Sequence, residues 1–156
     1  MHHQLLGVSI MMLFAQLGSA QSPPAAEEAS IRTQLSAYAQ VRQGGDGHAQ
    51  AAFYTDDADA WFSGTREMAK GQAEIARDLN VSSGSRPFRL DVEAIGFLGP
   101  DVALVDARYF SVSAEPSGHV FYVMVKRDGV WKIRAARIAS FSSAPRLESP
   151  GAEPVR

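Results

Sequence analysis

The chain contains no cysteine among its 156 residues. This absence excludes a disulfide framework, a thiol nucleophile, a zinc site built on cysteine and a lipid anchor on an N-terminal cysteine. The sequence also has no Gly-rich phosphate loop, no serine nucleophile elbow and no heptad repeat. The usual signatures of nucleotide binding, serine hydrolysis and coiled coils are therefore missing. Function has to be sought in the fold and in individual side chains.

Neither sign of charge is in excess. The 15 Lys and Arg residues face 17 Asp and Glu residues, which gives a net charge of −2 at pH 7. No basic field exists to attract nucleic acid. The hydrophobic fraction of 46% and the charged fraction of 21% are those of a globular chain and argue against wholesale disorder. The length suits one domain.

An apolar run near the start, from Leu5 to Leu17, is shorter than the roughly 20 residues that a membrane-spanning helix needs. The small residues Gly18-Ser19-Ala20 follow it, as in a secretory signal peptide. We expect residues 1–20 to be removed after Ala20, and the mature protein to be periplasmic or secreted, with no stable membrane anchor. Because residues 1–4 contain no Lys or Arg, an uncleaved anchor and a wrongly assigned start site stay open as alternatives.

Helical periodicity dominates the first half of the remaining chain. Apolar residues recur at helical spacing from Ile31 to Val41, which predicts a helix that begins after Pro24 and ends at Gly44-Gly45. Asp46 is a suitable N-cap for a short second helix. Residues 58–63 and 66–70 predict a short hairpin. A third helix is expected over 71–79, followed by a loop over 80–85.

From Arg86 onward the apolar period changes to two. Turn signals at Gly99-Pro100-Asp101, at 115–118 and at Asp128-Gly129 divide this part into four strands. The element order predicts an α+β fold, in which a curved antiparallel sheet (a four-strand meander plus the short hairpin) packs against three helices of the N-terminal half. Residues 143–156 predict a disordered tail, which leaves one domain over 21–142.

The Asp-Gly pair is typical of a two-residue hairpin loop, so Arg127 should pair with Val130. This register places Met124 opposite Ile133, Tyr122 opposite Ala135 and Val120 opposite Arg137. A middle turn centred near Pro116 would set Tyr109 beside Tyr122. The side that the helices cover then collects the following residues: Phe88, Leu90, Val92, Val105, Ala107, Tyr109, Tyr122, Met124, Trp131, Ile133, Ala135 and Phe141.

The opposite face of this sheet carries charged residues beside a high proportion of apolar ones. It is too apolar to stay fully exposed to solvent, so we expect a homodimer that forms through the outer sheet face. The same register pairs Arg108 with Asp91 and sets Glu93 against Asp106, an unfavourable contact of like charges. A slip of one residue would exchange the two faces.

Several short motifs, taken in order, resemble a known family. They are Tyr38, Gly45-Asp46, Phe53-Tyr54-Thr55-Asp56-Asp57-Ala58, Gly71, Leu98-Gly99-Pro100-Asp101-Val102-Ala103-Leu104-Val105 and Arg127-Asp128-Gly129-Val130-Trp131-Lys132-Ile133. The chain resembles the SnoaL-like branch of the nuclear transport factor 2-like superfamily, and within it the SgcJ/EcaC-type group, over about residues 25–142. The resemblance implies a cone-shaped α+β fold with an apolar pocket between sheet and helices, commonly dimeric. Its members range from cyclases, isomerases and dehydratases to non-catalytic association modules and domains of unknown function.

The chain departs from this pattern at two places. Isomerase-like members carry their general base five residues after the second Asp of the Asp-Asp-Ala motif, and Phe62 stands there. A phenyl ring takes no proton, so that mechanism is disfavoured. Many relatives place His, Gln or Asn near the end of the last strand, where this chain has Ala136-Arg137-Ile138-Ala139.

Arg137 is expected to point inward and to meet a carboxylate, because an unpaired buried charge is unfavourable. Tyr109 and Tyr122 would stand beside it as hydroxyl donors, and Trp61 joins them as a further ligand-binding candidate. By the resemblance, Tyr38 occupies the position of an oxyanion-stabilising tyrosine. Each of these residues equally suits a structural role: Arg137 reaching water at the rim, and the aromatic residues packing in the core.

Asp59 is the acidic residue whose direction would suit a catalytic base. Asp56 and Asp57 are explained by helix closure and turn chemistry. His48 and His119 lie far apart in the sequence, so no metal site is expected. No cofactor is expected either.

We interpret the chain as an exported small-molecule-binding domain whose apolar pocket takes a hydrophobic or carboxylate-bearing molecule. One alternative is a cyclase- or isomerase-like enzyme with Asp59 as base and Tyr38 or Arg137 stabilising an enolate. Another is a non-catalytic homodimeric association module. An acid pointing into the pocket would favour the enzyme, and an open interior lined by Tyr and Arg without an acid would favour binding. A pocket filled by side chains, together with a large apolar interface, would favour the association module.

Overall fold

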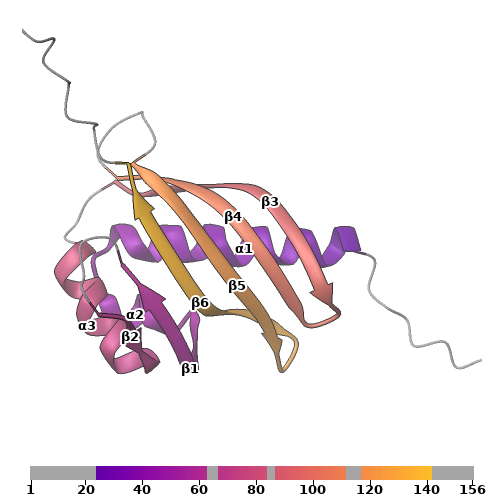
Figure 1. Cartoon of the computed structure of the whole chain (residues 1–156), viewed down its shortest axis with the longest axis horizontal. Helices are drawn as coiled ribbons and strands as arrows, with labels where there is room; N and C mark the ends of the chain where they lie inside the picture. Colours follow the sequence, from indigo (N-terminus) through magenta and orange to yellow (C-terminus); the bar gives the residue numbers. More distant parts are fainter. Residues whose placement is uncertain (1–23, 63–66, 84–86, 112–116, 142–156) are drawn as a thin grey trace, which may run out of the picture.

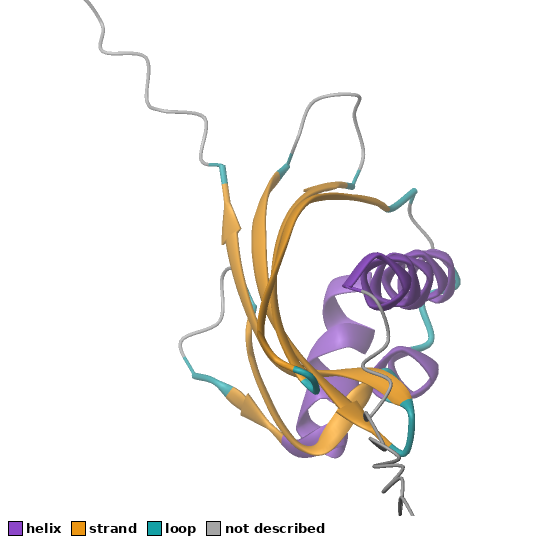
Figure 2. Cartoon of the chain, turned by 90° about the vertical axis from the view of Figure 1, so that its right-hand side faces the viewer, coloured by secondary structure: helices purple, strands orange, loops and turns teal. Residues whose placement is uncertain are grey.

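A computed structural model describes residues 24–62, 67–83, 87–111 and 117–141. The predicted signal peptide and the predicted tail lie outside these residues. A curved six-stranded sheet carries the helices on its concave side (Figures 1 and 2). The elements are α1 (Pro24–Gln43), α2 (Gly47–Ala51), β1 (Tyr54–Trp61), β2 (Ala69–Lys70), α3 (Gly71–Ser83), β3 (Arg89–Gly99), β4 (Val102–Phe110), β5 (Gly118–Arg127) and β6 (Val130–Ser140). No helix among the described residues is long and apolar enough to cross a membrane.

The first two helices follow the sequence prediction. Helix α1 lies across the concave face (Figure 2) and buries its apolar stripe, including Ile31 and Leu35, against the sheet. It ends before Gly45, whose φ of 76° lies in the left-handed region that glycine tolerates. Asp46 caps α2, because its carboxylate accepts hydrogen bonds from the backbone N–H groups of His48 and Ala49 at 2.9 and 3.1 Å.

Helix α3 is longer than predicted and continues through residues assigned to a loop. Asn80 lies inside it, and its side-chain Oδ1 accepts a hydrogen bond of 2.7 Å from the backbone N–H of Gly47. A Cβ added to Gly47 would lie 2.2 Å from the carbonyl oxygen of Ala76. The glycine therefore allows α2 to pack closely against α3, a contact that sequence periodicity does not reveal.

The sheet order is β2-β1-β6-β5-β4-β3, with β6 between the hairpin and the rest of the meander. Strand β1 pairs with β6 in parallel, so the sheet is mixed, whereas we expected antiparallel pairing throughout. Strand β1 also begins earlier than predicted, at Tyr54. The cause is its pairing with β6: the backbone N–H of Ile133 donates to the carbonyl of Phe53 at 2.9 Å.

The predicted pairing of Arg127 with Val130 is confirmed, and Met124 lies opposite Ile133 as expected. Beyond that point β6 contains a β-bulge. Val123 pairs with Ala135, so Arg134 is an extra residue with no partner position on β5. An extra residue reverses the direction of every side chain that follows it.

The prediction for the end of β6 is therefore wrong by one residue. Tyr122 lies opposite Ala136, not Ala135, and both are buried on the concave side. Arg137 lies opposite Phe121 on the convex face, where we had expected it to point inward. Phe141, also expected inside, is 52% exposed.

The other two turns close at shifted positions. Tyr109 pairs with Gly118 instead of Tyr122, and because this shift is even in residue number, the side chains of β4 and β5 keep their predicted direction. In the β3–β4 ladder, the two irregularities at Val92/Ala94 and Phe97/Gly99 shift the stretch between them by one residue, so that Ile95 and Phe97 pack against the core. At Gly118, an added Cβ would lie 2.7 Å from Cε1 of Tyr109, which means that the tyrosine ring crosses the strand where a side chain is absent.

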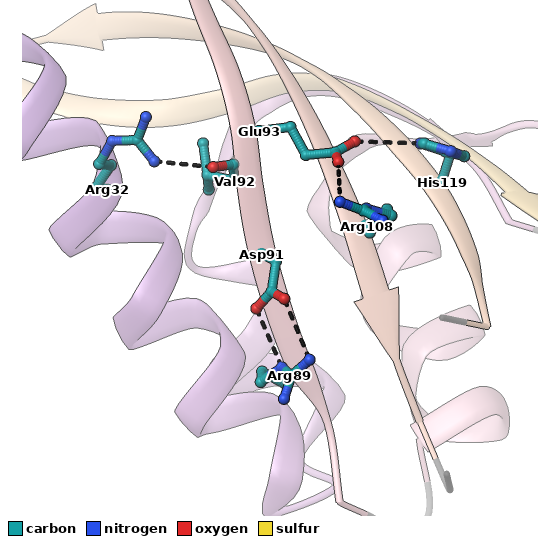
Figure 3. A network of polar contacts seen from close by, with 7 residues as sticks. All are labelled: Arg32, Arg89, Asp91, Val92, Glu93, Arg108 and His119. Atoms are coloured by element: carbon teal, nitrogen blue, oxygen red, sulfur yellow. Dashed lines mark hydrogen bonds and ion pairs between the residues drawn. The ribbon is translucent and has the colours of Figure 1, made fainter. Parts of the chain in front are cut away.

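The edge strand β3 is protected by α1 and by a bulge (Figure 3). The guanidinium of Arg32 donates to the carbonyl of Val92 at 2.9 Å. Glu93 is the bulged residue and forms ion pairs with Arg108 and with His119. Because Ala94 takes the place opposite Asp106, the unfavourable contact predicted for Glu93 does not form. Such features discourage pairing with another chain.

Arg108 lies opposite Asp91 in the ladder, as predicted. Its ion pair, however, is with Glu93, and Asp91 instead pairs with Arg89 on its own strand, Nε to Oδ1 at 3.1 Å (Figure 3). The bulge at Glu93 accompanies this exchange, because it removes Glu93 from the position opposite Asp106 and leaves its carboxylate to pair with Arg108.

The N-terminal turn of α1 is fixed to the β5–β6 hairpin by Glu27. Its carboxylate accepts a hydrogen bond of 2.7 Å from the indole Nε1 of Trp131 and lies 2.7 Å from Nζ of Lys126. Trp131 is 1% exposed, so its indole N–H has no access to bulk water. This contact fixes how α1 crosses the concave face.

We expect Glu27→Ala to lower the free energy of unfolding by about 1–3 kcal/mol, because a buried indole N–H loses its acceptor. Glu27→Gln retains an acceptor oxygen and should lose less. Urea denaturation measures both. The control is Glu28→Ala, which removes an exposed ion pair with Arg32 and should change the free energy by no more than about 0.5 kcal/mol. Equal losses for Glu27→Ala and Glu28→Ala would contradict this role of Glu27.

Candidate functional site

Three tyrosines from three elements meet on the concave side, below the C-terminal half of α1. Tyr38 of α1 makes edge-to-face contacts with Tyr54 of β1 and Tyr122 of β5, with ring centroids 6.0 and 6.4 Å apart. All three are at most 1% exposed. The hydroxyls of Tyr38 and Tyr54 are hydrogen-bonded at 3.3 Å. An otherwise apolar core thus contains a group of polar atoms.

Arg42 lies one turn after Tyr38 on α1 and points to the same side. Its Nη1 lies 3.5 Å from the hydroxyl of Tyr38 and 3.4 Å from Oε1 of the buried Gln50. The guanidinium carbon sits 4.5 Å from the ring centroid of Phe88, a cation–π contact. We call Tyr38, Arg42, Tyr54 and Tyr122 the arginine–tyrosine cluster. Among the described residues, no carboxylate lies within ion-pair distance of Arg42.

The environment of this cluster shifts the pKa values of Tyr54, Tyr122 and Arg42. Burial raises the pKa of Tyr54 and of Tyr122 well above the ordinary value, and the neighbouring Tyr38 raises both further, while Arg42 lowers them. Burial lowers the pKa of Arg42, but the three tyrosines together raise it, so that it ends above its ordinary value. The cluster therefore presents neutral hydroxyls and one fixed positive charge.

An aromatic row connects the cluster to the rim of the sheet. The ring of Phe88, which Arg42 covers, stacks on Tyr109 with centroids 6.2 Å apart. The hydroxyl of Tyr109 is hydrogen-bonded to Oγ of Ser140 at 2.7 Å. Phe88 and Tyr109 are half-buried, whereas Tyr38 is fully buried. The row therefore leads from partly exposed aromatic surface to the buried cluster.

The structure divides the predicted site residues between the two faces of the sheet. Tyr38 and Tyr122 lie together in the cluster, and Tyr109 lies on the same side at the rim. Trp61 pairs with Arg137 in the ladder and is 51% exposed on the convex face. Trp61 therefore does not line the concave side, where we had expected it. Successive side chains of β1 point to opposite faces, and Ala58 and Ala60 take the inward positions, so Trp61 points outward.

Asp59 also lies on the convex face, held by two arginines. Its carboxylate is 2.5 Å from Nη2 of Arg137 and 3.2 Å from Nη1 of Arg134. Arg134 also pairs with Asp57 at 3.3 Å. The predicted combination of Asp59 as base with Tyr38 is therefore not assembled, because the sheet separates them. Arg137 does meet a carboxylate, but one outside the core.

Phe62 occupies the inward position at the end of β1 and is 4% exposed. The place that the family resemblance gives to a general base is thus filled by a phenyl ring on the side of the cluster. In the described parts of the chain, no three His, Asp or Glu side chains converge to hold a metal ion.

Sequence reasoning missed Arg42 and Tyr54. The signal for Arg42 was present, because it follows Tyr38 by four residues on a helix and such residues share a face. Tyr54 was outside the predicted strand, which was expected to begin at Ala58. Its inward position depends on the pairing of β1 with β6, which the local pattern does not contain.

The sequence matches no protein-family model, and no curated protein matches it either. Solved structures do resemble it. A domain of unknown function with a cystatin-like fold from Nostoc punctiforme is 23% identical, with a TM-score of 0.63 over 78% of this chain and 82% of that one. A ketosteroid isomerase-like protein from Erwinia carotovora atroseptica is 20% identical, with a TM-score of 0.62 over 74% and 97%.

A third similar structure is a nuclear transport factor 2-like protein with a cystatin-like fold from Novosphingobium aromaticivorans. It is 14% identical, with a TM-score of 0.59 over 77% of this chain and 85% of that one. The chain therefore has the cystatin-like cone fold of the nuclear transport factor 2-like proteins, as the sequence motifs predicted. At these identities the likeness concerns the fold.

The buried tyrosines predict a specific loss of stability in alkali. An unfolded chain releases tyrosine protons near pH 10, whereas Tyr54 and Tyr122 hold theirs to higher pH in the fold. Their contribution is therefore complete below about pH 10 and is lost as the pH rises above it. The double variant Tyr54→Phe, Tyr122→Phe should lose less stability between about pH 10 and 12.

Denaturation at a series of pH values, with tyrosinate absorbance as a second signal, measures this effect. The control is Tyr109→Phe, which removes a tyrosine at the rim and keeps the two buried ones. The idea fails if the double variant and the wild type lose stability equally over this pH range.

Proposed function

We propose that this protein is an exported small-molecule-binding domain whose ligand lies on the concave side of the sheet, against the arginine–tyrosine cluster. The observation that carries the proposal is the aromatic row. It runs from half-buried Phe88 and Tyr109 through the guanidinium of Arg42 to the buried hydroxyl of Tyr38. An apolar wall with a few convergent polar groups is the usual form of a small-molecule site.

Binding is supported over catalysis by what the cluster contains. General acid–base chemistry needs a group that exchanges a proton near the working pH. The raised pKa values of Tyr54 and Tyr122 keep those hydroxyls neutral, and Arg42 stays charged. Asp59 is paired with arginines on the other face, and Phe62 stands at the family's base position. We therefore favour a binding domain over a cyclase- or isomerase-like enzyme.

The test compares two phenylalanines on opposite faces of the sheet. Native mass spectrometry of protein from the exporting host first identifies a retained molecule, and a library of small aromatic compounds provides further probes. Phe88→Ala should weaken binding of such a compound by about tenfold or more, because a large apolar contact is lost. The matched control is Phe121→Ala, a half-buried phenylalanine on the convex face, which should leave affinity within about twofold.

Titration calorimetry measures the affinities. The proposed function is wrong if no molecule is retained and no compound binds, or if both variants weaken binding equally.

We further propose that two copies associate through the convex face. The described chain places no helix against this face (Figure 2). It carries half-buried Phe121 and Val123 beside exposed Trp61, while the nearby charges of Asp59, Arg134 and Arg137 are already paired within the chain. Phe121→Glu should therefore convert a dimer to a monomer in light scattering, whereas Thr33→Glu on the exposed side of α1 should not. A wild type that is monomeric at all concentrations would refute this association.

Export is proposed from the sequence alone. The mature protein should begin at Gln21, and intact mass measurement of protein from the periplasm or the medium tests this. A protein that keeps residues 1–20 would contradict it.

A further inference from the structure

The proposed function does not specify which chemical group of the ligand reaches Tyr38, at the buried end of the aromatic row. We propose, as an extension of the proposed function, that Arg42 and the hydroxyl of Tyr122 bind a carboxylate group of that ligand. Two separate observations support this: the missing anionic partner of Arg42 and the missing hydrogen bond of Tyr122.

Arg42 differs from the other arginines in the described part of the chain. Six of them lie within ion-pair distance of a carboxylate, mostly at the surface. The seventh, Arg127, is exposed. Arg42 is half-buried on the concave side, and its contacts with described residues are to neutral oxygens and a ring. A guanidinium removed from water without an anion is unfavourable. The six paired residues are Arg32, Arg77, Arg89, Arg108, Arg134 and Arg137.

The donors of Arg42 are also incompletely used. A guanidinium has five N–H donors in a planar fork. Both hydrogen bonds of Arg42 to described residues come from Nη1, and at 3.4 and 3.5 Å both are long. Nε and Nη2 make none within the described residues. These two nitrogens form the edge that binds a carboxylate with two parallel hydrogen bonds.

Tyr122 supplies the second observation. Its side chain is 1% exposed, and no hydrogen bond joins its hydroxyl to another described residue. This oxygen is not among the fully buried side-chain atoms that lack a partner, so it keeps some accessible surface at which an acceptor can bind. The ring of Tyr122 contacts the ring of Tyr38, with centroids 6.4 Å apart. Arg42 and Tyr122 both adjoin Tyr38, and we therefore place the acceptor oxygen beside Tyr38.

The charge of the site favours a carboxylate over a phosphate. Arg42 is the cation that contacts the tyrosines; no Lys or second Arg of the described residues does so. One guanidinium balances a single negative charge, whereas a phosphate ester carries up to two. The half-buried rings of Phe88 and Tyr109 then face the apolar body of the same molecule.

The experiment compares acids with their uncharged amides, which have nearly the same shape. The probes are acetate, benzoate and 2-naphthoate, each paired with its carboxamide, and calorimetric or NMR titrations measure the affinities. Acetate is included because it fits any accessible carboxylate site regardless of the space around it. In the wild type, we expect the acid of at least one pair to bind about tenfold more tightly than the amide.

Arg42→Gln should reduce this acid preference to within about twofold, because the charged fork is lost. The matched control is Arg127→Gln, which removes the same charge from an exposed arginine at the β5–β6 turn and should leave the preference unchanged. Tyr122→Phe should weaken acid binding about fivefold.

Two further measurements keep the test informative if Arg42→Gln does not fold. Arg42→Lys keeps the charge without the fork, and it should retain only part of the preference. In the wild-type protein, the Nε–H resonance of Arg42 should shift on titration with the acid and stay in place with the amide.

Two outcomes overturn the carboxylate assignment: acid and amide bind equally in every pair, including no binding by either, or the acid preference persists in Arg42→Gln. Neither result by itself refutes the proposed function, which depends on the separate comparison of Phe88→Ala with Phe121→Ala.

Discussion

The extra residue in β6, Arg134, is the constraint on which the two faces of the sheet depend. It reverses the direction of the residues that follow, so that the small Ala136 faces Tyr122 and Arg137 faces outward. Without it, a guanidinium would have to enter the tyrosine-rich interior from β6. A bulge also bends its strand and increases its twist, which agrees with the curvature of the sheet around α1 (Figure 2). The inserted Arg134 thus affects both the curvature of the sheet and the face on which the charge of Arg137 lies.

The charges of the protein are distributed accordingly. On the convex face, Asp59 pairs with Arg134 and Arg137, and Asp57 also pairs with Arg134, so that two carboxylates balance the two cations of β6. On the concave side, Arg42 meets neutral hydroxyl and amide oxygens only, among the described residues. An interior of low polarity strengthens interactions of such a charge and makes an unfilled donor more unfavourable. This contrast is the physical basis for proposing a ligand on the concave side and an association of two copies through the convex face.

Much of the fold follows from short stretches of sequence. The stripe of α1, the cap at Asp46 and the Asp-Gly turn that pairs Arg127 with Val130 are confirmed, because each depends on residues only a few positions apart. Part of the site follows as well: Tyr38 and Tyr122 share the concave side as expected. Helical spacing also places Arg42, four residues after Tyr38, on the same face of α1.

By itself, the sequence determined the order of the elements, the α+β class and an interior rich in tyrosine, since periodicity and turn residues encode these locally. Only the tertiary structure decided that β1 lies parallel to β6, and that Asp59 therefore finds Arg137. It also decided the bulge at Arg134. The physical reason is that strand register is selected by long-range pairing and packing. An alternating pattern looks the same on both sides of an inserted residue, although every later side chain changes face.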